Sequence, residues 1–248
     1  MLELDKIVLK FKADDHELTA LKEISLHFET GKIYVITGPN GSGKSSLARV
    51  IMGIHRPGSG RVIFDGEDIT GLGITERSRK GIGYAFQHPA RFKGLRVADI
   101  LEIAMRNGEH NDCHYLSELG LCPEDYLERP LDASLSGGEI KRIEIATLLA
   151  LNPRLRIFDE PEAGIDLWSF EQLIEVIGAS HRPDTTTIII SHQEKILQMA
   201  DQIILLEDGA VSLHGPREQV WPVIRDSVRC ACRQDCSRGG MYYVNCPR

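Results

Sequence analysis

The chain has 248 residues, of which 42% are hydrophobic and 26% are charged, a composition that suits one globular domain with a buried core and a smaller subdomain. Its net charge of -7 at pH 7 excludes an overall basic field that would attract nucleic acid or anionic lipid, so we expect no nucleic-acid partner. A charged N-terminal segment and the lack of an apolar run near the roughly 20 residues of a membrane span indicate a cytoplasmic protein. The chain has six cysteines, and in a reducing cytoplasm thiols serve metal or redox chemistry before disulfides.

The first part of the chain has the pattern of short strands. Aliphatic residues dominate the runs 7–11, 24–28, 33–37 and 62–64, and polar turns separate these runs. Such runs bounded by turn residues predict β-strands. We therefore expect a β-rich N-terminal lobe.

The remainder changes to helical spacing and then alternates. Apolar residues over 97–105, and shorter segments up to Pro130, predict a small helical subdomain at about 89–133. Predicted helices at 137–151, 167–179 and 193–200 then alternate with predicted strands at 155–158, 187–190 and 203–206, which indicates a largely parallel sheet. Past Arg225 the pattern dissolves, so we expect one domain at 1–225 and a cysteine-rich tail at 226–248.

A glycine-rich segment follows the predicted strand at 33–37. It matches G-x-x-x-x-G-K-[ST], and an amphipathic run comes after it, which is the context this motif requires. Glycines let backbone N–H groups surround a phosphate, the lysine neutralises phosphate charge, and the serine hydroxyl can bind Mg²⁺. The predicted nucleotide-binding residues are Gly38, Pro39, Asn40, Gly41, Ser42, Gly43, Lys44, Ser45 and Ser46.

A second motif, Leu135-Ser136-Gly137-Gly138-Glu139, begins the predicted helix at 137–151. Ser136 and Glu139 have the spacing of a capping box. Capping does not require two glycines, which disfavour helix and let another group approach the backbone. A helix N-terminus open to an anion is therefore the functional interpretation. With the loop at 38–45, this motif resembles the signature of the ABC ATPases, a resemblance that extends to Pro222.

The resemblance implies an α/β ABC ATPase fold with a RecA-like parallel-sheet core, an N-terminal antiparallel β lobe and a small helical subdomain. In that family the signature of one subunit closes on the γ-phosphate held by the other subunit. It therefore implies a dimer with a second copy of the chain, in which Ser136, Gly137 and Gly138 contact the nucleotide of the partner.

Five further residues match positions of the family. Asp159 and Glu160 follow the predicted strand at 155–158, and the resemblance assigns Asp159 to Mg²⁺ and Glu160 to the attacking water. Successive side chains at a strand end leave opposite faces, so adjacent carboxylates can take separate roles. Gln87 resembles the Q-loop glutamine that senses Mg²⁺ and water, His192 the switch histidine, and Asp166 the D-loop aspartate that crosses the dimer interface.

The resemblance thus implies hydrolysis of ATP with Mg²⁺ as cofactor. The expected metal ligands are Ser45, Gln87 and Asp159, and the expected catalytic residues are Lys44, Gln87, Glu160 and His192. Water would attack the γ-phosphate in line, and positioning and charge neutralisation would supply the catalysis. Phe11 resembles the aromatic residue that stacks on adenine, with a core position as the alternative.

Two motifs distinguish between machines of this family. Glu139-Ile140-Lys141-Arg142 and Glu162-Ala163-Gly164-Ile165-Asp166 are more similar to the Suf-type iron-sulfur assembly ATPase than to importer ATPases. That reading implies a scaffold partner of the SufB/SufD type. The alternative is the ATP-binding subunit of an ABC membrane transporter, with a transmembrane permease as the partner.

The tail does not belong to the ABC pattern. Its spacing fits no single metal template, and either the thiols bind a metal or an iron-sulfur cluster or they are incidental. The cysteines concerned are Cys230, Cys232, Cys236 and Cys246.

Two single residues also stay open. Arg156 interrupts an apolar strand, where a guanidinium costs burial energy unless it is paired. Phe92, between Arg91 and Lys93, is either an exposed anchor for a partner or part of the core of the helical subdomain.

Overall fold

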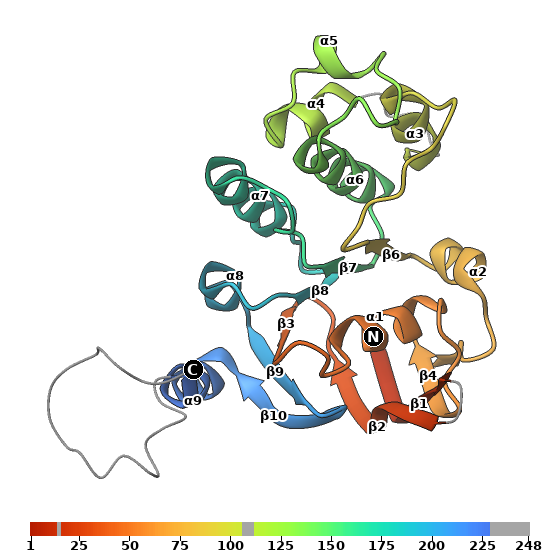
Figure 1. Cartoon of the computed structure of the whole chain (residues 1–248), viewed down its shortest axis with the longest axis vertical. Coiled ribbons are helices and arrows are strands. Elements are labelled where there is room, and N and C mark those ends of the chain that lie inside the picture. The colour runs from red at the N-terminus through yellow and green to blue at the C-terminus, as the bar shows by residue number, and fades with distance from the viewer. Residues whose placement is uncertain (14–15, 106–111, 229–248) are drawn as a thin grey trace, which may run out of the picture.

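The computed structural model of the chain describes residues 1–13, 16–105 and 112–228. It contains a four-stranded antiparallel sheet, a six-stranded mixed sheet and a group of helices beyond the mixed sheet (Figure 1). The four thiols Cys230, Cys232, Cys236 and Cys246 lie outside the described residues. Within the described ranges no helix has the length and hydropathy needed to cross a membrane.

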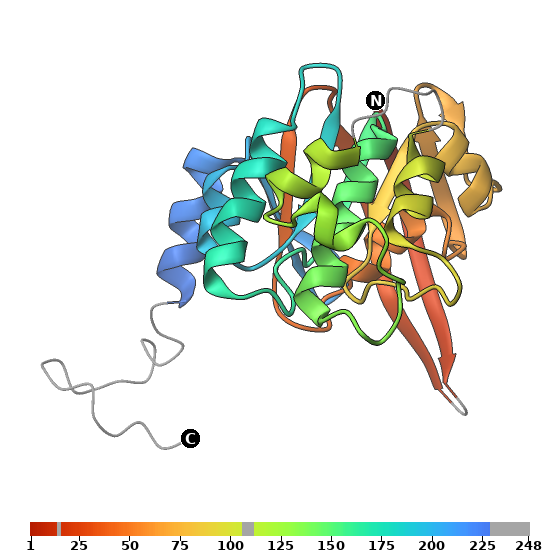
Figure 2. The ribbon, with the colours of Figure 1, turned by 90° about the horizontal axis from the view of Figure 1, so that it is seen from above.

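The antiparallel sheet has the strand order β2-β1-β4-β5. Its strands are β1 (Leu2–Ala13), β2 (His16–Phe28), β4 (Ser59–Phe64) and β5 (Glu67–Asp68). β1 and β2 form a long hairpin that extends past the helices in Figure 2, with Phe11 opposite Leu18. The predicted strands at 7–11 and 24–28 are therefore parts of longer strands, because pairing along the hairpin continues the ladder into polar sequence.

The mixed sheet has the order β10-β9-β3-β8-β7-β6. Its strands are β3 (Ile33–Thr37), β6 (Ile82–Ala85), β7 (Leu155–Asp159), β8 (Thr186–Ile190), β9 (Gln202–Glu207) and β10 (Ala210–Pro216). Only β10 runs antiparallel to its neighbour. Every residue of β3, β6, β7 and β8 is buried, as expected for parallel strands with both faces covered.

The described residues form helices on both faces of the mixed sheet and a further group of helices beyond it. The helices are α1 (Lys44–Met52), α2 (Ile74–Arg79), α3 (Val97–Ala104), α4 (Asp112–Glu118), α5 (Pro123–Tyr126), α6 (Gly137–Leu151), α7 (Leu167–Ala179), α8 (Glu194–Gln198) and α9 (Arg217–Val228). α6 and α7 span the same residues as the predicted helices. α3, α4 and α5 gather around α6, at the top of Figure 1.

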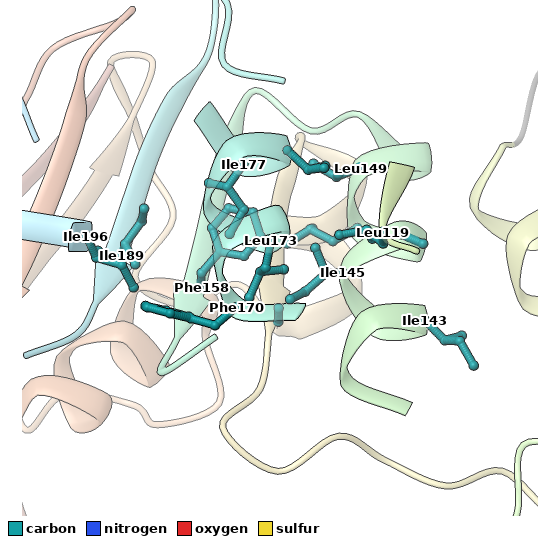
Figure 3. Close-up of a cluster of buried hydrophobic side chains, with 14 of the residues drawn as sticks. Leu119, Ile143, Ile145, Leu149, Phe158, Phe170, Leu173, Ile177, Ile189 and Ile196 are labelled. Atoms are coloured by element: carbon teal, nitrogen blue, oxygen red, sulfur yellow. The ribbon is translucent and has the colours of Figure 1, made fainter. Parts of the chain in front are cut away.

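Two apolar clusters hold these layers together. One contains Phe158 and Ile189 of the mixed sheet with Ile145 of α6 and Leu173 of α7, and Figure 3 shows these side chains between the sheet and the helices. The other contains Ile157 and neighbouring residues, which face the antiparallel sheet and α1. Adjacent residues of β7 thus enter different clusters, because successive side chains leave opposite faces of a strand. The parallel strands are fixed from both sides, and their C-terminal ends support the site.

Candidate nucleotide-binding site

The loop 38–43 joins the C-terminal end of β3 to the N-terminus of α1, and two of its glycines cannot be replaced without strain. At Gly38 the φ angle is 140°, and a Cβ atom would lie 2.0 Å from the carbonyl oxygen of Leu206. At Gly43 φ is 98°, and a Cβ atom would lie 2.7 Å from the carbonyl oxygen of Ala20. The loop therefore lies tightly against β9 and β2, and the free N–H groups of the first turn of α1 provide an anion site.

Lys44 begins α1 and lies against this loop. Its Nζ donates hydrogen bonds to the carbonyl oxygens of Gly38 (2.9 Å) and Pro39 (2.8 Å). Burial lowers the pKa of Lys44, while the carboxylates of Glu160 and Asp159 act in the opposite direction. The Oγ of Ser42 is buried and finds no hydrogen-bond partner within the described residues, as expected of a loop built to enclose a ligand.

Ser45 and Asp159 bring two oxygen ligands together. Ser45 Oγ donates to Asp159 Oδ1 at 2.9 Å, and the hydroxyl of Tyr84 donates to Asp159 Oδ2 at 2.6 Å. Burial first, and then Asp159, raises the pKa of Tyr84, so its hydroxyl remains a donor. Hydroxyl and carboxylate oxygens are the donors that Mg²⁺ accepts, so these residues fit that ion. The sequence prediction missed Tyr84, although it is a polar side chain within an otherwise apolar strand.

Glu160 leaves the end of β7 in a left-handed conformation, with φ 45°. Its backbone N–H donates to the carbonyl oxygen of Ile190 at 3.0 Å, and its Oε2 accepts from Gln87 Nε2 at 2.5 Å. A non-glycine residue in this region stores strain, which is typical of functional sites. The carboxylate of Glu160 is thus fixed from two sides, by its backbone and by Gln87.

Lys44, Ser45 and Glu160 line a cleft of about 730 Å³, whereas Asp159 is not among its lining residues. The structure brings together most of the predicted site, namely Phe11, Asn40, Gly41, Gly43, Lys44, Ser45, Ser46, Gln87, Glu160 and His192. The cleft also has lining residues that the sequence prediction did not include, namely Leu18, Thr19, Ala20, Lys22, Asp208 and Gly209. Leu18 is 63% exposed opposite Phe11, and exposure of this kind has no signal in the sequence.

Phe11 lies at the rim of this cleft and is half-buried. Its ring meets the His55 ring edge to face, with 5.2 Å between centroids. One part of the aromatic ring therefore packs on the protein while the residue also lines the cleft, so the two alternatives for Phe11 are not exclusive.

The signature residues do not join this cleft. Ser136 caps α6: its Oγ accepts from Glu139 N–H at 3.2 Å, and its N–H donates to Glu139 Oε2 at 2.7 Å. Gly137 is exposed with open space around it. A Cβ atom at Gly138 would lie 3.3 Å from the carbonyl oxygen of Gly164, so the signature adjoins the loop before Asp166.

Asp166 caps the neighbouring helix. Its Oδ1 accepts the N–H groups of Trp168 and Ser169, both at 3.1 Å. None of Ser136, Gly137, Gly138 and Asp166 is among the described residues that line the cleft. The chain therefore presents two separate surfaces: a cleft containing the phosphate-binding loop and a second surface formed by the signature and the loop before α7.

Arg156 is paired, which accounts for its place in an apolar strand. Its guanidinium, 3% exposed, donates to the carbonyl oxygen of Ser180 at 2.8 Å and to Asn152 Oδ1 at 3.0 Å. Burial lowers its pKa to about 10. Asn152 and Ser180 end α6 and α7, so Arg156 ties together the C-terminal ends of two helices.

Phe92 is 45% exposed at a second, apolar cavity of about 460 Å³. Phe86 and Ile103 also line that cavity and are exposed by 38% and 63%. Phe86 directly precedes Gln87, so the apolar cavity adjoins the segment that enters the cleft.

Comparison with known proteins gives one consistent family. A family model described as ABC transporter matches residues 21–163. An ABC transporter ATP-binding protein of Methanocaldococcus jannaschii is 40% identical over 81% of this chain and 84% of that protein. The sulfate/thiosulfate import ATP-binding protein of Bordetella bronchiseptica is 33% identical over 82% of this chain. The chain spans only 59% of the length of that second relative.

Solved structures agree with these sequence matches. The dimeric post-hydrolysis state of an ATP-binding cassette bound to ADP and Pi has a TM-score of 0.79, with 25% identity over 88% of this chain and 99% of that chain. The ADP conformation of an ABC transporter cassette has a TM-score of 0.74, with 28% identity over 91% of this chain and 95% of that chain. The predicted fold class is confirmed by these matches.

Proposed function

Because this chain belongs to the ABC transporter family of ATP-binding proteins, we propose that it works as a head-to-tail pair whose hydrolysis of ATP drives a membrane permease. The chain is an ATPase of that family. The observation that carries the proposal is the separation of the cleft from the signature surface. Each chain then supplies only half of each complete ATP site.

Within one cleft, the side chains divide the work of binding and hydrolysis. The loop 38–43 and Lys44 bind the phosphates, and Ser45 and Asp159, with Gln87, would hold Mg²⁺. Bound Mg²⁺ would neutralise charge on the β- and γ-phosphates. Glu160 orients the attacking water and accepts its proton.

The outer part of the site has its own roles. Gln87 holds Glu160 in place through the 2.5 Å hydrogen bond, and His192 contacts the γ-phosphate from the end of β8. Phe11 stacks on the adenine. Ser136, Gly137 and Gly138 of the second copy close on the γ-phosphate, and Asp166 of each chain lies at the interface between the copies.

A complementation experiment tests the head-to-tail pair. Lys44→Ala removes phosphate binding, and Ser136→Arg blocks the signature, so each variant alone is expected to be inactive. An equal mixture should regain about a quarter of the wild-type rate of phosphate release, because half of the mixed dimers are heterodimers and each has one complete site. No recovery in a mixture that exchanges subunits would contradict the proposed pair.

The Glu160→Gln variant is the matching control for dimerisation. It should bind ATP but stall hydrolysis, which traps the closed pair and doubles the mass from 27.7 kDa in light scattering with ATP. Phosphate release should fall at least about 100-fold. Undiminished hydrolysis in this variant would remove Glu160 from the proposed role.

A permease is the partner that the relatives favour, since one of them is a sulfate/thiosulfate import ATP-binding protein. We assign its docking site to the apolar cavity of about 460 Å³ lined by Phe86, Phe92 and Ile103, with the chain on the cytoplasmic side of the membrane. An apolar segment of the permease would cover these exposed side chains. Contact there would reach Gln87 through its neighbour Phe86.

The Suf-type scaffold is the second candidate, and the residues after the signature favour it. Lys141 and Glu144 are both inward-facing on α6 and contact Phe86. Isolation of the chain from its host without oxygen, from soluble and membrane fractions, distinguishes the candidates. A multi-span membrane protein as partner supports the permease, whereas a SufB/SufD-like protein carrying iron supports iron-sulfur assembly.

The tail thiols Cys230, Cys232, Cys236 and Cys246 are proposed to bind a metal or an iron-sulfur cluster under the second candidate. Metal analysis of anaerobically purified protein, before and after removal of residues 229–248, tests this. A metal content near zero with all six thiols titrating would contradict it.

A further inference from the structure

Two oppositely charged side chains of α6 hold the main-chain N–H and C=O groups of Phe86. Glu144 Oε1 accepts the N–H of Phe86 at 3.0 Å, and Lys141 Nζ donates to the carbonyl oxygen of Phe86. Lys141 Nζ and Glu144 Oε2 are 3.5 Å apart. The ion pair and the main chain of Phe86 therefore form one closed group, in which the carboxylate meets the N–H that it attracts and the ammonium meets the carbonyl oxygen.

A buried ion pair is a poor source of stability for a protein core. Lys141 is fully buried and the Glu144 side chain is 17% exposed. Burial lowers the pKa of Lys141 and raises the pKa of Glu144, and in both cases it is the largest influence. Buried ion pairs of this kind often contribute less stability than apolar residues of equal volume. The presence of this ion pair in α6 therefore indicates that Lys141 and Glu144 serve to position a neighbouring group.

The position of the held peptide identifies that role. Phe86 directly precedes Gln87, whose Nε2 donates to Glu160 Oε2 at 2.5 Å. The side chain of Phe86 is 38% exposed at the apolar cavity, so packing of its ring alone does not fix its main chain. A turn of the Phe86 peptide would move the Gln87 amide away from Glu160.

α6 supplies the other end of this connection. The same helix begins at Gly137, beside Ser136 of the signature, and α-helices transmit displacement along their axis as rigid elements. A shift of the signature end of α6 therefore reaches the main chain of Phe86 through the side chains of Lys141 and Glu144.

We propose that Lys141 and Glu144 are positioning residues that orient the main chain of Phe86 and thereby hold the Gln87 side chain on Glu160. They connect the signature helix of a chain with the water-activating carboxylate of the same chain. This inference rests on the proposed roles of Gln87 and Glu160 in hydrolysis.

Two double variants separate positioning from packing. Lys141→Glu with Glu144→Lys retains an ion pair but opposes a carboxylate to a carbonyl oxygen and an ammonium to an N–H. Lys141→Met with Glu144→Leu retains volume and removes both charges, and should fold because apolar replacement of a buried pair is often neutral. Both lose the correctly polarised contacts, so kcat should fall about tenfold or more, with the KM for ATP within about twofold.

A matched surface pair serves as the control. Lys80 and Glu67 form an ion pair at 2.5 Å with side chains 33% and 60% exposed, and Lys80→Met with Glu67→Leu should leave kcat unchanged. Wild-type kcat in either Lys141/Glu144 double variant would overturn the inference. If the charge exchange does not give a cooperative unfolding transition, the Met/Leu variant decides alone. Absence of hydrolysis in the wild type would instead refute the proposed function itself.

Discussion

Arg77→Met is the substitution for which the structure gives the clearest expected cost. Arg77 is 1% exposed and donates to five main-chain carbonyl oxygens, at 2.7 to 3.1 Å. Two of these belong to Val50 and Ile51, near the end of the helix that begins with Lys44. The loss of these five hydrogen bonds costs about 5 kcal/mol at about 1 kcal/mol each.

The same substitution removes the cost of a buried charge. Burial lowers the pKa of Arg77 to about 10, which corresponds to about 3 kcal/mol of penalty on the charged form. The expected net loss is therefore about 2 kcal/mol in the free energy of unfolding at pH 7. In a domain of this size it should lower Tm by about 4–8 °C.

Urea and thermal unfolding followed by circular dichroism measure this loss. Arg79→Met is the matched control, because Arg79 lies on the same short helix and is exposed, and its substitution should change stability by less than about 0.5 kcal/mol. If Arg77→Met were as stable as Arg79→Met, the five hydrogen bonds would have no net value beyond the burial cost, and the reasoning would be wrong.

Three further predictions concern the loop, the signature helix and the sheet. Gly38→Ala should abolish ATP binding in a fluorescent-nucleotide titration because its Cβ would meet the Leu206 carbonyl oxygen at 2.0 Å, whereas Gly66→Ala, outside the loop with φ 81° and open space around it, should retain ATP binding and lose only about 1 kcal/mol of stability. The pKa of Glu139 is lowered from 4.5 to about 2, first by the hydrogen bond from Tyr126. The contribution of Glu139 to stability is therefore complete above pH 4.5 and is lost as pH falls toward 2. Glu139→Gln should make the free energy of unfolding depend less steeply on pH between 4.5 and 2. Arg156→Met should change the free energy of urea unfolding by less than about 1 kcal/mol, because three lost hydrogen bonds at about 1 kcal/mol each are offset by relief of a burial penalty of about 3 kcal/mol, as for Arg77; a loss of several kcal/mol would contradict this account.

The sequence predicted the elements whose pattern is local. The helices at 137–151 and 167–179 were found at their observed bounds because apolar spacing and capping residues Ser136 and Asp166 mark them. The phosphate-binding loop and the carboxylates Asp159 and Glu160 were recognisable because neighbouring residues form each motif. β10 and α9 were not predicted, since β10 is an edge strand whose residues are only partly buried and α9 contains Pro222.

Contacts between distant main-chain groups could not be predicted. Arg156 is satisfied by the carbonyl oxygen of Ser180, and Lys141 by the carbonyl oxygen of Phe86. A carbonyl group has the same chemistry at every residue, so no side chain signals which one a buried cation will meet. The pairing of Tyr84 with Asp159 was hidden for a related reason: it depends on β6 and β7 lying side by side.

Under the proposed stacking of Phe11 on the base, the base end of the cleft differs in character from the phosphate end. Phe11, Leu18 and Ala20 line it, and an aromatic ring stacks on any nucleobase, since every base has a π face. Strong rejection of a related substrate requires buried groups that hydrogen-bond its distinguishing atoms, and these three side chains offer none. These three side chains are therefore expected to discriminate weakly between nucleobases, and the phosphate end is expected to supply most of the affinity for the nucleotide.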